Sequence, residues 1–140
     1  MGDHIKYKKG YKYQLQENYS IFINIIPESD IDLGWISLKK DGILSFKKGY
    51  AWDGPSGPTF DTLDSMRGSL VHDGGYQLLR EGKLLEEYRK VFDELLEGIC
   101  IEDGMSKFRA WYWYIGVRRF AIWAASPAHE PKVIVAPKED

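Results

Sequence analysis

Cysteine is nearly absent from this chain of 140 residues: Cys100 is the only one, so no internal disulfide can form. No run of apolar residues reaches the roughly 18 that a membrane-spanning helix needs. The first residues also lack the apolar stretch of a secretory signal. An excess of one charge is missing too, because 19 Lys and Arg balance 21 Asp and Glu, and a net charge of −2 gives no general attraction to duplex nucleic acid. We therefore expect a soluble, cytoplasmic protein.

The composition is that of an ordinary globular domain with many aromatic residues. Hydrophobic residues make up 44% of the chain, and five Trp and nine Tyr raise the aromatic share to 14%. The length suits a single domain over residues 1–140, large enough to bury a core. We divide it into a strand- and turn-rich part (1–60), a helical part (61–125) and an extended tail (126–140) that holds three of the six prolines.

The first part predicts a small antiparallel meander of three or four strands. Residues 19–26 are rich in β-branched and aromatic side chains, and Pro27 ends the run. Residues 34–46 predict a hairpin in which Asp41 and Gly42 supply the positive φ angles of a tight turn. A second turn at residues 47–49 leads into Trp52.

The second part predicts three helices. An apolar stripe from Met66 to Leu79 forms the first, Gly82 interrupts it, and residues 84–99 form an amphipathic second helix. Ser106 is the expected N-cap of a third helix over about residues 107–125. The fold class is therefore α+β, with a small N-terminal antiparallel sheet followed by three helices, the first two forming an antiparallel hairpin.

The third helix is aromatic almost all round, with arginines interspersed. Such a helix either contacts a membrane surface or lies buried against the sheet, and we favour burial because a helix that is apolar on every side is typically a core helix. Its arginines also suit phosphate, and its aromatic rings suit stacking on a base, which together fit a nucleotide ligand.

Folding the helical hairpin about Gly82 brings a histidine and an acid together. His72 lies ten residues before Gly82 and Asp93 eleven after it, so the two side chains lie at about the same height. A carboxylate on one ring nitrogen fixes the tautomer and leaves the other nitrogen to take a proton from water. Tyr76, one turn beyond His72 on the same side, completes the candidate catalytic set.

The loop before the first helix is the candidate metal and substrate site. Asp73 points about 100° around the helix from His72. With Asp53 and carbonyl oxygens of the Gly- and Pro-rich loop at residues 54–58, it suits a divalent cation, Ca²⁺ or Mg²⁺. The alternative is that this loop is simply a turn. The candidate substrate-binding residues are Trp52, Ser56, Arg80 and Arg118.

Gly74 and Gly75 cost stability inside a helix, roughly 1 kcal/mol each relative to Ala. Their presence indicates close packing of another chain segment or of a ligand. The adjacent His72 and Asp73 also suggest a metal-dependent phosphohydrolase, but the remaining histidines, His4 and His129, lie in terminal segments.

The motifs Lys48-Gly-Tyr-Ala-Trp-Asp-Gly-Pro-Ser-Gly-Pro58 and Ser69-Leu-Val-His-Asp-Gly-Gly-Tyr-Gln-Leu-Leu-Arg80, with Phe92-Asp93 and Tyr114-Ile-Gly-Val-Arg118, carry a resemblance. Over residues 35–120 the chain resembles a phage- and prophage-associated family of domains of unknown function. That resemblance implies a viral or prophage origin and a location in the host cytoplasm.

The order of these motifs also resembles the active-site helices of secreted bacterial phospholipases A(2). The resemblance implies that His72 is the base, that Asp73 binds Ca²⁺ and that Asp93 orients His72. Two differences from that family are the single cysteine and the position of Phe92 before the second acid.

Two classes of function remain open. The first is a hydrolase acting on a small-molecule ester or phosphodiester, either a phospholipid or a cyclic-nucleotide defence signal. The second is a non-enzymatic phage protein, a virion component or a binder of a host factor or nucleotide, in which the same residues form a structural polar network.

Overall fold

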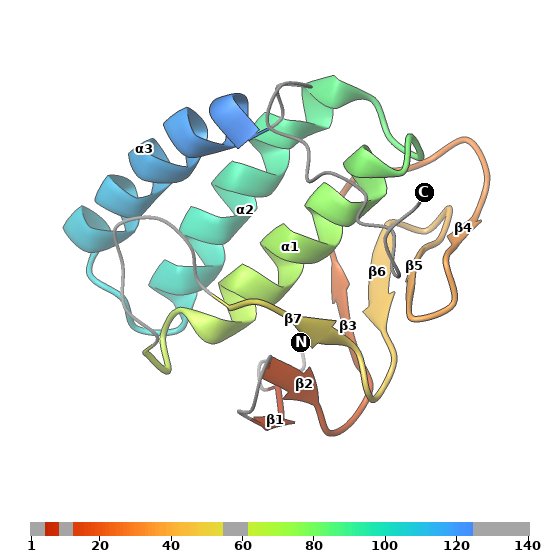
Figure 1. The fold of residues 1–140 in the computed structure, drawn as a ribbon, viewed down its shortest axis with the longest axis horizontal. Coiled ribbons are helices and arrows are strands. Elements are labelled where there is room, and N and C mark those ends of the chain that lie inside the picture. The colour runs from red at the N-terminus through yellow and green to blue at the C-terminus, as the bar shows by residue number, and fades with distance from the viewer. Residues whose placement is uncertain (1–4, 9–12, 55–61, 125–140) are drawn as a thin grey trace, which may run out of the picture.

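A computed structural model of the protein describes residues 5–8, 13–54 and 62–124. Short strands occupy the first half of the chain and three helices the second, which confirms the predicted α+β class. In Figure 1 the helices lie side by side in the order α3, α2, α1, with the strands on the far side of α1. The predicted tail at residues 126–140 lies outside the described residues.

The strands form two antiparallel sheets, whereas we expected a single meander. One sheet has the order β1-β2-β7 and the other has the order β3-β6-β5-β4. The strands are β1 (Tyr7–Lys8), β2 (Tyr13–Leu15), β3 (Tyr19–Phe22), β4 (Ile31–Asp32), β5 (Ile36–Leu38), β6 (Ile43–Phe46) and β7 (Ala51–Trp52). Strands of two or three residues are too short to show an alternating pattern, so β1, β2 and β4 escaped prediction.

The predicted hairpin is the one that joins β5 to β6, with Leu38 opposite Leu44. Gly42 has a φ of +81°, but Asp41 does not share this left-handed conformation, so that part of the prediction was wrong. The Asp41 carboxylate instead accepts a hydrogen bond from the Ile43 amide at 3.0 Å. The amide of Gly42 donates to the Lys39 carbonyl at 2.9 Å, so the turn needs only one glycine.

The first two helices form the predicted hairpin. Helix α1 spans Met66–Arg80, and Gly82, at a φ of +70°, ends it in the manner of a helix C-cap, with the Lys83 amide donating to the Leu78 carbonyl. The second helix begins later than predicted: a 3-10 turn, η1 (Glu86–Tyr88), precedes α2 (Arg89–Glu102). The reason is local, because Leu85 has an extended backbone and cannot continue a helix.

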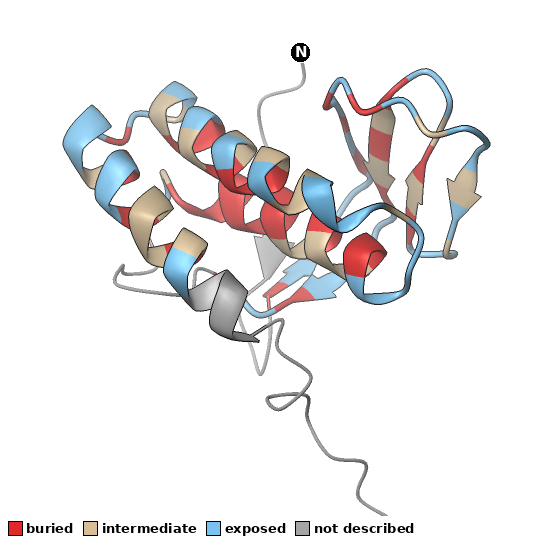
Figure 2. Cartoon of the chain, turned by 90° about the horizontal axis from the view of Figure 1, so that it is seen from above, coloured by how far each residue is buried: buried red, intermediate tan, exposed pale blue. Residues whose placement is uncertain are grey.

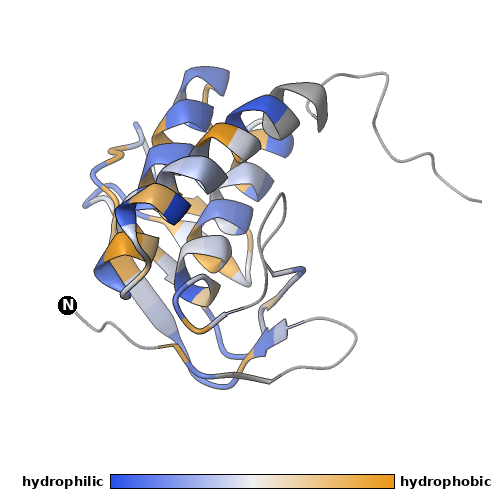
Figure 3. Cartoon of the chain, turned by 90° about the vertical axis from the view of Figure 1, so that its left-hand side faces the viewer, coloured by the Kyte–Doolittle hydropathy of each residue, from blue (hydrophilic) through white to orange (hydrophobic). Residues whose placement is uncertain are grey.

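Helix α3 (Lys107–Ala124) packs on α2 and not against a sheet, which corrects the expected burial. The Ser106 hydroxyl accepts a hydrogen bond from the Arg109 amide at 3.2 Å, which confirms the predicted cap. Over residues 107–119 of α3, the buried side chains Ala110, Trp113 and Val117 lie on one face and join a cluster with α2. On the outer side, which Figure 3 faces, Phe108, Trp111 and Tyr112 are 75%, 51% and 50% exposed. None of the described helices has the length and apolar character of a membrane span.

Helix α1 is the central element, and its buried residues face the main core (Figure 2). Glycines allow its neighbours to approach. A Cβ on Gly75 would lie 2.2 Å from the Phe92 ring, and one on Gly74 would lie 2.5 Å from the Phe46 ring. The close packing that these glycines indicated is therefore with α2 and the sheet.

Cys100 lies on α2 at the junction of the three helices. Its thiol is fully buried in the cluster between α2 and α3. A Cβ on Gly68 of α1 would lie 2.8 Å from its sulfur. Burial, with the charges of Asp103 and Asp64, raises the pKa of the thiol to about 12.

Candidate functional site

The predicted contact between His72 and Asp93 exists. Nε2 of His72, on α1, lies 2.6 Å from Oδ1 of Asp93, on α2. The Tyr76 hydroxyl donates to the same oxygen at 2.7 Å, and Nη1 of Arg118, on α3, donates to Oδ2 at 2.8 Å. Asp93 has no exposed surface, so these three partners replace the water that its carboxylate loses on folding. We call these four residues the Asp93 network.

Helix geometry explains why these side chains meet. Tyr76 follows His72 by four residues, so both point from the same side of α1, and their ring centroids lie 4.2 Å apart. The hairpin turn then sets Asp93 opposite them. The sequence also singled out Arg118, but as a substrate-binding residue, whereas in the structure its guanidinium pairs with Asp93 and its side chain is 27% exposed.

The network holds Asp93 as an anion. Burial raises the pKa of Asp93, but hydrogen bonds from His72, Tyr76 and Arg118 lower it more, and the net pKa is below the usual value. Burial lowers the pKa of His72, yet the two carboxylates of Asp73 and Asp93 outweigh it and leave that pKa raised. Burial and the bond to Asp93 raise the pKa of Tyr76, so its hydroxyl keeps its proton and donates.

Among the described residues, the second ring nitrogen of His72 has only an ion-pair contact, which is to Asp73. Nδ1 lies 3.9 Å from Oδ1 of Asp73, which is too far for a hydrogen bond, and no other described residue bonds to it. His72 keeps 7% of its surface exposed and the Asp73 side chain 27%. Nδ1 is therefore the atom of the network that can exchange a proton with water or a ligand.

Asp73 and Asp53, the two predicted metal ligands, lie on this side of His72. Burial raises the pKa of Asp73, the charge of His72 opposes that rise, and the charge of Asp53 adds to it. Within the described residues no group of three or more His, Cys, Asp or Glu side chains could hold a metal ion. A Ca²⁺ site takes six to eight oxygens, so backbone carbonyls would have to supply most of them. The loop at residues 55–61 lies outside the described part of the chain, and the cation stays a prediction.

The predicted substrate-binding residues do not gather at one place. Trp52 is 2% exposed, and its indole N–H donates to the Ser69 hydroxyl at 3.0 Å, so it is a core residue. Arg80 is exposed at the last turn of α1, about 12 Å along the helix from His72. Ser56 lies outside the described residues.

A second buried charge escaped the sequence analysis. Arg67, near the start of α1, is 2% exposed, and its guanidinium donates to Asp103, to Glu102 and to the Tyr19 hydroxyl. These four residues are the Arg67 network. The predicted helical hairpin could have indicated this network. An antiparallel hairpin sets the start of the first helix, with Arg67, beside the end of the second, with Glu102 and Asp103.

The chain matches no protein-family model, no curated protein and no solved structure. The resemblances to the phage-associated family and to the phospholipases therefore stay predictions, and the argument for function depends on the geometry of the site.

Proposed function

We propose that this protein is a hydrolase in which His72 is the general base. Nδ1 of His72 takes a proton from a water molecule, and that water attacks the carbonyl carbon of an ester or the phosphorus of a phosphodiester. The C–O or P–O bond to the leaving alcohol then breaks, and the leaving oxygen takes the proton from Nδ1, which restores the neutral base. The observation that supports this most is that Nε2 is held by Asp93 at 2.6 Å while Nδ1 has no hydrogen-bond partner among the described residues. A histidine with one nitrogen fixed and the other available has the arrangement that a general base needs.

The other members of the network position the base. Asp93 keeps its negative charge because its pKa is lowered, so it stabilises the imidazolium that forms when His72 takes the proton. Tyr76 and Arg118 each hold one oxygen of that carboxylate, which fixes the direction in which it faces His72. The proton therefore moves at Nδ1, and Asp93 does not have to accept it.

Asp73 and Asp53 would hold the cation in this proposal. Ca²⁺ or Mg²⁺ beside Asp73 would neutralise negative charge as it develops on the carbonyl or phosphoryl oxygen. The resemblance to phospholipases A(2) favours a lipid ester as the substrate. The resemblance to the phage family favours a small cyclic nucleotide that serves as a host defence signal.

A hydrolysis panel tests the proposal. Phospholipid vesicles and cyclic dinucleotides are incubated with the protein, with Ca²⁺, with Mg²⁺ and with a chelator, and released product is measured. We expect turnover of one class, and a loss of about 100- to 10,000-fold in His72→Ala. Arg67→Met is the matched control, because it disturbs a buried charge elsewhere and should keep turnover per folded molecule. A folded wild-type protein that turns over neither class contradicts the proposal.

One observation favours a second candidate, a non-enzymatic phage protein. The Asp93 network joins one side chain from each of α2 and α3 to two from α1, so it could serve only to fix the three helices. On that hypothesis His72→Gln, if it stays folded, keeps full biological activity. On the hydrolase hypothesis the same folded variant is inactive.

A further inference from the structure

A groove opens at the end of α1 that lies away from His72. It has a volume of about 410 Å³ and lies between the loop before β4 and the connection from α1 to η1. Gly82, on one of its walls, is ten residues beyond His72 in the chain. None of the residues of the Asp93 network lines it, so it is separate from the proposed hydrolytic site.

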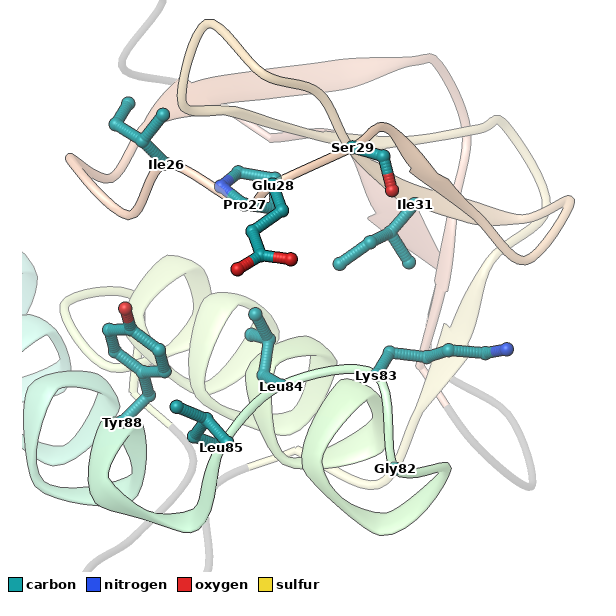
Figure 4. A pocket seen from close by; sticks show the side chains of 10 residues that line it. All are labelled: Ile26, Pro27, Glu28, Ser29, Ile31, Gly82, Lys83, Leu84, Leu85 and Tyr88. Carbon is teal, nitrogen blue, oxygen red and sulfur yellow. The ribbon is translucent and has the colours of Figure 1, made fainter.

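Polar and apolar atoms contribute about equally to the lining of the groove. Leu84 and Tyr88 form one wall, and Ile26, Pro27 and Ile31 lie across from them (Figure 4). At the rim, Ile26 and Leu85 are 54% and 65% exposed, which leaves apolar surface in water at the mouth of the groove. A volume in the range of small-molecule pockets, with a lining that is about half apolar, suits a compact organic ligand that carries both a polar group and an apolar body.

Glu28 is an exposed residue, and its carboxylate points into the groove. The Glu28 carboxylate projects towards Leu84 and the wall that carries Tyr88, while the Lys83 ammonium extends away from it (Figure 4). Neither the Glu28 carboxylate nor the Tyr88 hydroxyl has a hydrogen-bond or ion-pair partner within the described part of the chain. The groove therefore offers an uncompensated negative charge close to an aromatic ring.

Acidic residues outnumber basic ones in the two segments that line the groove. Residues 26–32 contain Glu28, Asp30 and Asp32 and no Lys or Arg. On the facing connection, Lys83 is outnumbered by acids at 81, 86 and 87, and Arg89 is already paired with Glu86. The local field therefore favours a cation over an anion.

We propose that this groove binds a small organic amine with an apolar body. The ammonium would lie between the Glu28 carboxylate and the Tyr88 ring, where a carboxylate and an aromatic face both attract a cation. The apolar body would lie against Leu84 and Ile31. This site does not depend on the hydrolase proposal, since it uses different residues at a different end of α1.

Three probes that share one ring system and differ in charge test the site. Tryptamine is cationic, tryptophol neutral and indole-3-propionate anionic, and each is titrated into the ¹⁵N-labelled protein while amide shifts are recorded. We expect tryptamine to move the amides of residues 26–31 and 82–88 in a saturable way. Tryptophol should bind more weakly and indole-3-propionate should not bind.

Two charge-removing variants test whether tryptamine binding depends on the Glu28 carboxylate. Glu28→Gln should weaken tryptamine binding about five-fold, the effect of losing one exposed ion pair. Glu94→Gln removes the same charge from the exposed side of α2 and should leave the Kd unchanged. Equal affinity for the three probes, shifts elsewhere in the protein, or an unchanged Kd in Glu28→Gln would each overturn the proposal. Binding of a basic peptide without binding of tryptamine would overturn it too, by making the groove a protein-docking surface.

Discussion

The Asp93 network and the Arg67 network both bury one charge between α1 and α2, but they are built from opposite charges. Asp93 accepts hydrogen bonds from three side chains, and one of them, His72, is a titrating group whose pKa is raised in the folded state. Arg67 donates to two carboxylates and a phenol. Hydrogen bonds to Asp103 and Tyr19 outweigh burial and raise its pKa, so its charge is permanent.

The two networks also differ in whether any donor or acceptor of their buried groups is left without a hydrogen bond. In the Arg67 network each guanidinium nitrogen has an acceptor, so the buried charge itself has no nitrogen left to bind a ligand. In the Asp93 network the carboxylate is satisfied but Nδ1 of His72 is not. Both networks therefore bury a charge, but within the described residues only the Asp93 network contains a titrating group, His72, with a ring nitrogen that makes no hydrogen bond.

Removing the central charge should have the largest effect, and it should be larger in the Asp93 network. Asp93→Ala leaves Arg118 and His72 without their acceptor in the core, and we expect a loss of about 3–5 kcal/mol in unfolding free energy. Arg67→Met should cost only about 1–3 kcal/mol, because Asp103 and Glu102 are 17% and 45% exposed and can be hydrated. Urea unfolding measures both. Equal losses of unfolding free energy in Asp93→Ala and Arg67→Met would contradict the prediction that the Asp93 network contributes more to stability.

Substitutions at the glycines of α1 should also destabilise the protein more beside Asp93 than beside Arg67, with smaller losses of unfolding free energy than the charge removals above. Gly75→Ala places a Cβ against the ring of Phe92, next to Asp93, and should destabilise the protein by about 1–3 kcal/mol. Gly68→Ala, next to Arg67, meets Cys100 at a longer distance and should cost less. As a control, Gly98→Ala lies in α2 with nothing nearby and should stabilise it by about 0.5–1 kcal/mol. If Gly75→Ala is neutral in thermal unfolding, α1 and α2 do not need this close approach.

The two phenols should differ because one donates and the other accepts. Tyr76→Phe removes one donor from Asp93, which keeps His72 and Arg118, and should cost about 1 kcal/mol. Tyr19→Phe leaves Nη1 of Arg67 buried without an acceptor and should cost more, about 1–3 kcal/mol. Chemical denaturation of the two variants in parallel gives the comparison, and a larger loss in Tyr76→Phe would reverse it.

The smallest expected effect is a pH dependence of stability, which the Asp93 network should show and the Arg67 network should not. The pKa of His72 is raised in the folded state above its ordinary 6.5, so its contribution to stability is complete below that pH and is lost as pH rises through the folded pKa. The difference in unfolding free energy between wild type and His72→Gln should therefore narrow as the pH rises above 6.5, while the difference for Arg67→Met stays constant. Turnover should change in the opposite direction, because the base works when it has lost its proton. A difference in unfolding free energy that widens with pH would contradict the raised pKa.

The hairpin arithmetic predicted the contact between His72 and Asp93 because it depends only on helix rise and on the glycine at 82. Arg118 was not predicted as a partner of Asp93, since its position requires the packing of α3 on α2, which an evenly aromatic sequence does not specify. Of the strands, β3, β5, β6 and β7 lie in the predicted meander, whereas β1, β2 and β4 were not predicted. Two-residue strands such as β1 and β4 form because a neighbour pairs with them, and local sequence does not encode that neighbour.

Cys100 gives this protein a built-in chemical reporter. A thiolate is the reactive form, and a buried thiol with a pKa of about 12 is almost entirely protonated at neutral pH. Labelling by a thiol reagent therefore requires the seam between the three helices to open, and the labelling rate measures how often it does. Cys100 and Asp93 both lie on α2, and α3 packs on the same helix. The labelling rate of the natural Cys100 therefore reports how often the helices around the candidate site separate, and no engineered probe is needed.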